Sequence, residues 1–157
     1  MATDPEQLRR RGLARRLISA PARIRRAAEV AEGVPPPVGE WTAEQIVLHL
    51  VAVETVVFQR RLADLAETES PAWDWMEPGP AEAGSDEALA DSLLRFAAAR
   101  LATLDWVAEL DEDGWQRSGR HATLGRLDVA GLLALAADHD QEHLSALVRL
   151  GRSAAPG

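Results

Sequence analysis

Four long stretches of the sequence place apolar residues at the spacing of an amphipathic helix, which strongly limits the folds open to the chain. The expected helices run from about residue 5 into the twenties, and over 42–66, 85–110 and 128–150. No segment alternates apolar and polar residues in the period-2 pattern of a strand. The pattern therefore predicts an all-α four-helix bundle.

The ends of these helices carry recognisable residues. Asp4 followed by a proline is a typical helix start, and Thr42 with Gln45 forms a capping box. Asp128 is placed to cap the last helix, and Gly151 is placed to end it. Within the first helix, Pro21 is expected to cause a kink or a break.

Three further features mark the segments between the helices. Residues 85–87, Ser-Asp-Glu, are placed to cap the third helix. The segment 68–84 is rich in proline, glycine and acid, so it is expected to be a loop. The three glycines within 114–127 predict a turn-like connection.

The composition fits one globular domain spanning 1–157, with a flexible tail from about 152 to 157. No run of roughly 18 apolar residues could span a membrane, and the first residues lack a signal-peptide core. We therefore expect a cytoplasmic protein. The absence of cysteine excludes disulfides and thiolate chemistry by the chain itself. A net charge of -8 makes nucleic acid an unlikely partner.

Three of the four histidines fall on faces expected to point into the bundle. His139 and His143 are four residues apart, so on a helix they lie on the same face, about 40° apart. Leu132 and Leu150 share that face, since both lie about 20° from His139 on an ideal helix. His49 lies in the apolar stripe of the second helix in the same way.

Buried imidazoles are costly without partners, and a divalent metal ion would satisfy all three. Histidines that only hydrogen-bond their neighbours in the core are the alternative interpretation. His121, in a glycine-flanked loop, is open to three interpretations: a further ligand, a polar group at the mouth of the site, or a surface residue.

Several charged residues near these histidines have two possible roles. Glu142 and Asp140 are weak candidates for a catalytic base or for orienting a ligand imidazole, and both could equally be solvated charges. Glu54 is expected to be a structural contact or a surface group. Arg60 lies about 20° from His49 around an ideal helix, so it could meet an anionic substrate or simply reach solvent.

The tryptophans divide in a similar way. Trp41 and Trp106 are expected to lie in the core. Trp73 and Trp75, in the long loop, could cover the site or mediate packing between two copies of the chain.

The sequence resembles the DinB/YfiT-like metalloenzyme family over nearly its whole length. The similarity is carried by three segments, in the family's order: Gly39 to Leu50, the Trp-Asp-Trp stretch at 73–75, and His121 to Leu144. The resemblance implies a four-helix bundle with an unusual connection order. It also implies a divalent metal, zinc or nickel, on His49, His139 and His143.

The better-understood members of this family are thiol-dependent transferases and isomerases that use bacillithiol, mycothiol or glutathione. The leading hypothesis is therefore a metal-dependent transferase that activates a low-molecular-weight thiol against a small-molecule substrate. The alternatives are a metal-dependent hydrolase and a non-catalytic metal-binding module of the stress response. Dimers are common in the family, so a homodimer is a further expectation.

Overall fold

The computed structural model describes residues 4–80 and 87–154 of the chain. Its helices and strands, in order, are α1 (Pro5–Ala31), α2 (Ala43–Ala52), the π-helical segment η1 (Val53–Gln59), α3 (Arg60–Glu67), β1 (Ala72–Trp73), α4 (Leu89–Ala108), α5 (Glu112–Gln116), β2 (Ser118–His121), β3 (Gly125–Asp128) and α6 (Val129–Ser153). No helix in the described part of the chain is both long and apolar enough to cross a membrane.

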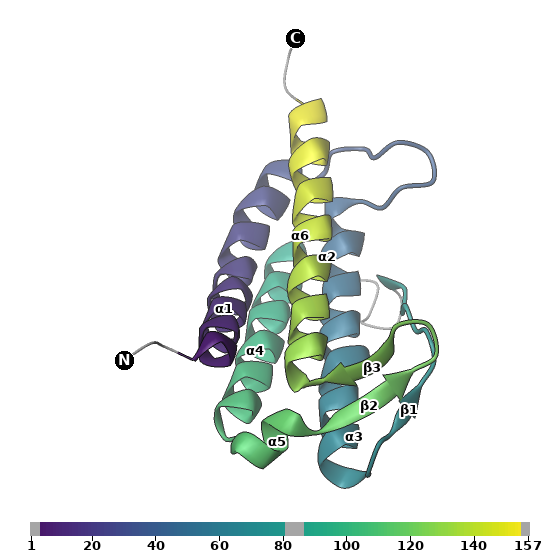
Figure 1. Cartoon of the computed structure of the whole chain (residues 1–157). Helices are drawn as coiled ribbons and strands as arrows, with labels where there is room; N and C mark the ends of the chain where they lie inside the picture. Colours follow the sequence, from purple (N-terminus) through teal and green to yellow (C-terminus); the bar gives the residue numbers. More distant parts are fainter. Residues whose placement is uncertain (1–3, 81–86, 155–157) are drawn as a thin grey trace.

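Four long rods form the bundle (Figure 1). Helices α2, η1 and α3 follow one another without a break and make one rod, while α1, α4 and α6 are the other three. α1 packs along α6 and α4, and the α2 rod packs against α4 and α6. The expected starts are confirmed: the Asp4 side chain accepts from the Glu6 amide, Thr42 and Gln45 form the capping box, and Asp128 caps α6.

Pro21 does not break α1, which continues ten residues beyond it to Ala31. A proline inside a helix lacks the N–H that would bond the carbonyl four residues earlier, here that of Leu17. The structure supplies another donor, because Nη1 of Arg100 on α4 donates to the Leu17 carbonyl at 2.9 Å. The missing bond is therefore replaced by a contact between helices.

Two other expected helix ends are wrong. α6 passes through Gly151 and ends at Ser153, because that glycine is helical here and packs beside Val30 of α1. α4 begins at Leu89 with Ala88 as its N-cap, which makes no side-chain hydrogen bond. Residues 85 and 86 of the expected cap lie outside the described residues, as does the end of the expected tail at 155–157.

A small three-stranded sheet was not expected from the sequence. β1 pairs parallel with β2, and β2 pairs antiparallel with β3, in the order β1-β2-β3 (Figure 1). Two to four residues are too few for an alternating pattern to stand out. Gly119 allows the close approach of β1: a Cβ there would meet the Trp73 ring and would lie 2.8 Å from the Pro71 carbonyl.

The π-helical segment η1 is the second feature that the periodicity missed. A π turn bonds i to i+5 and accommodates one extra residue, so everything after it is rotated back by about one residue, roughly 100°. Thr55 lies in this segment, and its hydroxyl donates to the Val51 carbonyl at 2.9 Å. The rotation decides which arginine of α3 faces the bundle interior, as described below.

A polar layer crosses the bundle between two apolar clusters. One cluster is formed by the later part of α1, α2, the first half of α4 and the end of α6. The other is formed by the earlier part of α1, η1, α3, the end of α4 and the start of α6. Between them lie three histidines and the buried ion cluster of Glu54, Arg100 and Asp140. The core is therefore apolar above and below a layer of polar side chains.

Candidate metal centre

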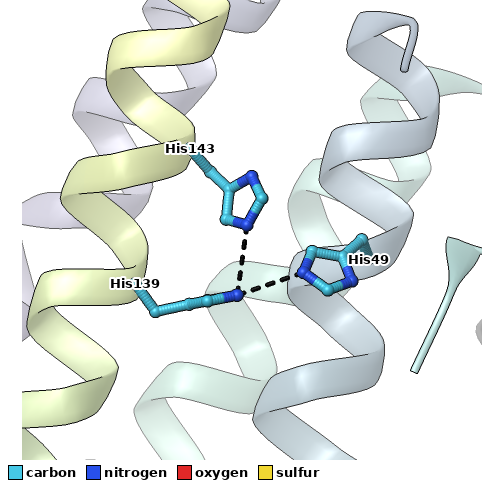
Figure 2. Close-up of side chains that lie close together, drawn as sticks. All are labelled: His49, His139 and His143. Carbon is cyan, nitrogen blue, oxygen red and sulfur yellow. Dashed lines mark hydrogen bonds between the residues drawn. The ribbon is translucent and has the colours of Figure 1, made fainter. Parts of the chain in front are cut away.

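Three histidines from two helices converge in the polar layer (Figure 2). His49 projects from α2, and His139 and His143 project from successive turns of α6. The Nε2 atom of His139 lies 3.0 Å from Nε2 of His49 and 3.1 Å from Nε2 of His143. All three ligand atoms lie within 4.8 Å of one another. The three side chains that the periodicity places on the inward faces of two helices therefore come together in the structure.

The tautomer of His49 is set by the loop that follows β1. Its Nδ1 lies 2.6 Å from the carbonyl oxygen of Pro78, which can only accept, so Nδ1 carries the proton and donates. The lone pair of Nε2 therefore faces the other two histidines. A carbonyl that holds the second nitrogen of a histidine in this way is the usual outer partner of a metal ligand.

Burial keeps His139 and His143 neutral. Desolvation, followed by the neighbouring His143, His49 and Arg100, lowers the pKa of His139 to about 3. Desolvation and then His49 lower the pKa of His143 to about 4. Both imidazoles are therefore neutral near pH 7, which is the form that binds a metal ion.

The arrangement fits a divalent metal ion better than it fits hydrogen bonding alone. A neutral imidazole carries one N–H, so Nε2 of His139 cannot donate fully to both neighbouring nitrogens. Two nitrogens bound to one zinc ion in tetrahedral geometry would lie about 3.3 Å apart, close to the spacings found here. Three nitrogen ligands would also leave such an ion with an open position.

Aromatic rings cover two sides of the histidine cluster. The ring centroid of Trp41, just before α2, lies 4.7 Å from that of His49. Trp41 is also stacked on His143, with 6.4 Å between the ring centroids. Phe58, in η1, meets His139 edge-on at 6.5 Å. Trp41 is half-buried and packs against the cluster between α1, α2 and α6, in line with its expected place in the core.

Two cavities reach the cluster from different sides. One of about 370 Å³ includes His139 and Phe58 in its wall, and one of about 410 Å³ includes His143 and Trp41. Trp75, 62% exposed, lines the first cavity, whereas Trp73 donates to Asp64 at 2.9 Å and belongs to the sheet. Of the two loop tryptophans, Trp75 is therefore the one beside the site.

The acidic candidates occupy quite different places. Both oxygens of Asp140 accept from Arg100, at 2.8 and 3.0 Å, so Asp140 neither orients an imidazole nor is a solvated charge. Its burial raises the pKa of its carboxyl, and Arg100 opposes that rise. Glu142 is exposed at the edge of the 370 Å³ cavity. Glu54 is buried and paired with Arg100, so it is a structural contact, the first of the two roles expected for it.

The arginine of α3 that faces the site is Arg61, whereas the sequence pattern pointed to its neighbour Arg60. Arg60 is exposed and pairs with Asp64 at 2.9 Å, which is the solvated role left open for it. Arg61 is buried and lines the 370 Å³ cavity. The π turns of η1 explain the difference, because the extra residue that they accommodate rotates Arg61 into the place expected for Arg60.

His121 also lines this cavity, from the end of β2. It is 2% exposed, so it is not a surface residue, and within the described part of the chain it does not join the group of three ligand atoms. Of the three interpretations left open for His121, a polar group at the mouth of the site agrees best with this position, but the sheet that holds it was not foreseen.

Comparison with known proteins supports the same fold. No curated protein gives a significant match. Among solved structures, the chain is similar to one described as YfiT from Bacillus subtilis, "a probable metal-dependent hydrolase with an unusual four-helix bundle topology". The identity is 20%, the TM-score is 0.77, and the alignment covers 97% of this chain and 90% of that chain. This confirms the predicted four-helix bundle, to which the small sheet is an addition. The family model of the DinB superfamily matches residues 4–147, and this protein therefore belongs to the DinB superfamily.

Proposed function

We propose that the protein is a metal-dependent enzyme in which His49, His139 and His143 hold one divalent ion, zinc or nickel. The observation that carries this proposal is the convergence of three Nε2 atoms from two helices, spaced 3.0 and 3.1 Å around His139. The description of YfiT as a probable metal-dependent hydrolase supports it from a protein of the same fold.

The residues around the cluster have distinct tasks in such an enzyme. The Pro78 carbonyl holds the ring of His49 with its lone pair inward, and Trp41 and Phe58 pack against the rings of His49 and His139. When bound, the ion supplies a Lewis acid that lowers the pKa of a thiol or water at its open position. The walls of the 370 Å³ cavity hold the substrate beside His139.

The reaction that we favour is transfer of a low-molecular-weight thiol, such as bacillithiol or mycothiol, to a small electrophilic substrate. A cysteine-free chain has no thiol of its own, so the sulfur must come from a co-substrate. Two cavities meet the cluster from different sides, which gives the thiol and the electrophile separate places. Glu142 is the one acidic candidate exposed at the substrate cavity, and it is placed to take up a proton there.

Hydrolysis is the second candidate, and the description of YfiT favours it. Cobalt substitution separates the two reactions. A thiol that binds the cobalt in the loaded protein produces an intense sulfur-to-metal charge-transfer band. A hydrolase shows no such band, and its cobalt spectrum changes with pH as a metal-bound water loses its proton.

A cytoplasmic location and a homodimer remain predictions. Light scattering after gel filtration measures whether the protein is a homodimer.

The first experiment is metal analysis of the full-length, untagged protein by elemental mass spectrometry. We expect close to one equivalent of divalent metal, lost in His49→Ala, His139→Ala and His143→Ala while helical circular dichroism persists. His121→Ala is the matched control, since it removes the fourth histidine and should leave the metal in place. Protein that stays metal-free after dialysis against zinc and nickel would contradict the proposal.

Activity then separates an enzyme from a binding module. Metal-loaded protein is assayed with thiols and electrophiles, and with ester and amide substrates, against free metal at the same concentration. A metal-loaded protein with no rate above free metal in either assay would leave the non-catalytic stress-response module as the better explanation.

A further inference from the structure

A buried cation with no carboxylate at ion-pair distance among the described residues lies in the wall of the 370 Å³ cavity. Arg61 is 8% exposed, and its Nη2 donates to the Asp74 carbonyl at 3.0 Å. The charge of Asp64, on the same helix, offsets part of the desolvation of Arg61, but the oxygens of Asp64 bind Arg60 and the Trp73 indole. In the described parts of the chain no carboxylate forms an ion pair with Arg61. A buried charge in this state is unfavourable, so a ligand that supplied an anion would be bound strongly.

A second polar group, without a hydrogen-bond partner among the described residues, belongs to His121 in the same cavity wall. The backbone N–H groups of Thr123 and Leu124 donate to Nδ1 of His121 at 3.0 and 3.1 Å. Nδ1 is therefore an acceptor, and the neutral ring carries its proton on Nε2. That Nε2 is buried and has no hydrogen-bond partner among the described residues. Burial, and then the charge of Arg61, lower the pKa of His121, which keeps the ring neutral.

The tightly turned β2–β3 hairpin explains why this donor is fixed. Its backbone amides hold the Nδ1 edge of the His121 ring, and the rings of Trp75 and His121 are T-shaped with 6.1 Å between centroids. That separation is too long for the indole face to serve as a good acceptor for the N–H. The donor is therefore held in place without an acceptor in the part of the chain that the structure describes.

The rest of the cavity sets the shape of a ligand. Val57, Phe58 and Leu135 give it an apolar wall, and His139 of the metal cluster also lines it. Glu77 and Glu142 line it as well, but both are exposed, so water screens their charge. Asp138 is occupied by Arg16 at 2.8 Å. Among the described residues, the buried polar groups of the cavity wall are thus one cation and one neutral donor, besides the imidazole of the metal cluster.

We propose that this cavity binds the carboxylate of a small apolar acid, with Arg61 and the Nε2–H of His121 as its two recognition groups. One guanidinium and one N–H donor match a singly charged carboxylate, whereas the second charge of a phosphate would find no second buried cation among the described residues of the cavity wall. The proposal deepens the proposed function, since it names the substrate class of that site. It rests on that function only in treating the bound acid as the substrate, whose other end reacts.

The test uses the full chain freed of metal with a chelator, so that a carboxylate cannot be bound by an ion. Hydrocinnamate, its uncharged amide, and phenyl phosphate are titrated calorimetrically. We expect hydrocinnamate to bind at least tenfold more tightly than the amide and more tightly than the phosphate. Equal affinity for acid and amide, or a preference for the phosphate, would overturn the proposal.

Variants assign the effect to the two groups. Arg61→Gln should weaken hydrocinnamate binding at least tenfold, and His121→Phe should weaken it several-fold. Arg60→Gln is the matched control: it removes the same charge one residue away, from a side chain that is exposed and points elsewhere. Equal losses in Arg60→Gln and Arg61→Gln would mean a general charge effect and would overturn the assignment.

A measurement on the wild type keeps the proposal testable if a variant fails to fold. Nitrogen-15 spectra of the imidazoles should show the proton of His121 on Nε2, and that nitrogen should shift when hydrocinnamate is added. A proton on Nδ1, or an unmoved resonance at saturation, would overturn the role of His121. Because no metal is present, a failure here leaves the metal proposal standing, and a failure of metal binding leaves this one standing.

Discussion

Replacing Arg100 with methionine removes the cation at the centre of the buried ion cluster. Its guanidinium makes five hydrogen bonds: two to Glu54 at 2.9 and 3.0 Å, two to Asp140 at 2.8 and 3.0 Å, and one to the Leu17 carbonyl at 2.9 Å. The side chains of both acids are 5% exposed or less. Arg100→Met therefore leaves two carboxylates in the core without a cation.

The expected loss follows from the desolvation of those carboxylates. Removing one partner of a buried ion pair lowers the free energy of unfolding by about 3–5 kcal/mol. For a chain of this size each 1 kcal/mol changes the melting temperature by about 2–4 °C, so the melting temperature should fall by about 6–20 °C. Arg25→Met is the matched control, because the Arg25–Glu29 pair is exposed and is worth about 0.5 kcal/mol or less.

The assay is urea unfolding of the metal-free protein followed by circular dichroism, at several pH values. In Arg100→Met the stranded carboxylates have raised pKa values in the folded state, so the folded state takes up protons first as the pH falls. The deficit relative to wild type should then narrow between pH 7 and about 5. A loss below about 1 kcal/mol, or a deficit that grows on acidification, would refute the reasoning.

Two further predictions test the sheet and the histidine cluster. Gly119→Ala should lower the free energy of unfolding, measured by thermal denaturation, by about 2 kcal/mol or more. It should also change Trp73 fluorescence, because the added Cβ would meet that ring. Gly12→Ala is the control: no atom lies within 4 Å of the added Cβ on an exposed helix face, so this variant should be neutral or more stable by up to about 1 kcal/mol. The lowered pKa values of His139 and His143, about 3 and 4 against 6.5, mean that the unfolded chain takes up protons first, so the stability of the metal-free protein should fall as the pH drops from about 6.5 towards 4. Substituting both histidines with leucine should flatten that slope in urea titrations, and an unchanged slope would assign it to other groups.

The sequence located the histidines well because their positions depend on local periodicity. His139 and His143 are on one helix, and His49 lies close to the capping box that starts α2, so a helical pattern was enough to place all three inward. The same reasoning failed after residue 53, where the π turns change the angle per residue. For that reason the pattern placed Arg60 on the inward face, where the structure has Arg61.

The buried ion cluster and the sheet depend on contacts between distant segments. Arg100 is 46 residues from Glu54 and 40 from Asp140, and each of these charges alone is typical of a solvated helix face. One local clue was available: Pro21 leaves the Leu17 carbonyl without its helical donor, which calls for a donor from another helix. The sheet gave no such clue, because its shortest strand has only two residues.

The ion cluster and the histidines are neighbours in the polar layer, which gives the cluster a second expected role. Asp140 follows His139 directly on α6, so the bond from Arg100 to Asp140 fixes the height of α6 beside α4. The bonds to Glu54 fix the α2 rod in the same way. Apolar side chains alone would permit small shifts of one helix along another, whereas a buried ion cluster has one good register.

This register role can be separated from stability with a variant that replaces all three charges, Glu54→Met, Arg100→Met and Asp140→Leu. Because no buried charge is left unpaired, its free energy of unfolding should lie within about 1–2 kcal/mol of wild type, far above that of Arg100→Met. Its affinity for zinc should nevertheless fall at least tenfold, since the histidines of α2 and α6 are no longer held at matching heights. Competition with a chromophoric chelator measures that affinity. A stable triple variant that binds zinc as tightly as wild type would show that apolar packing alone sets the register of the site.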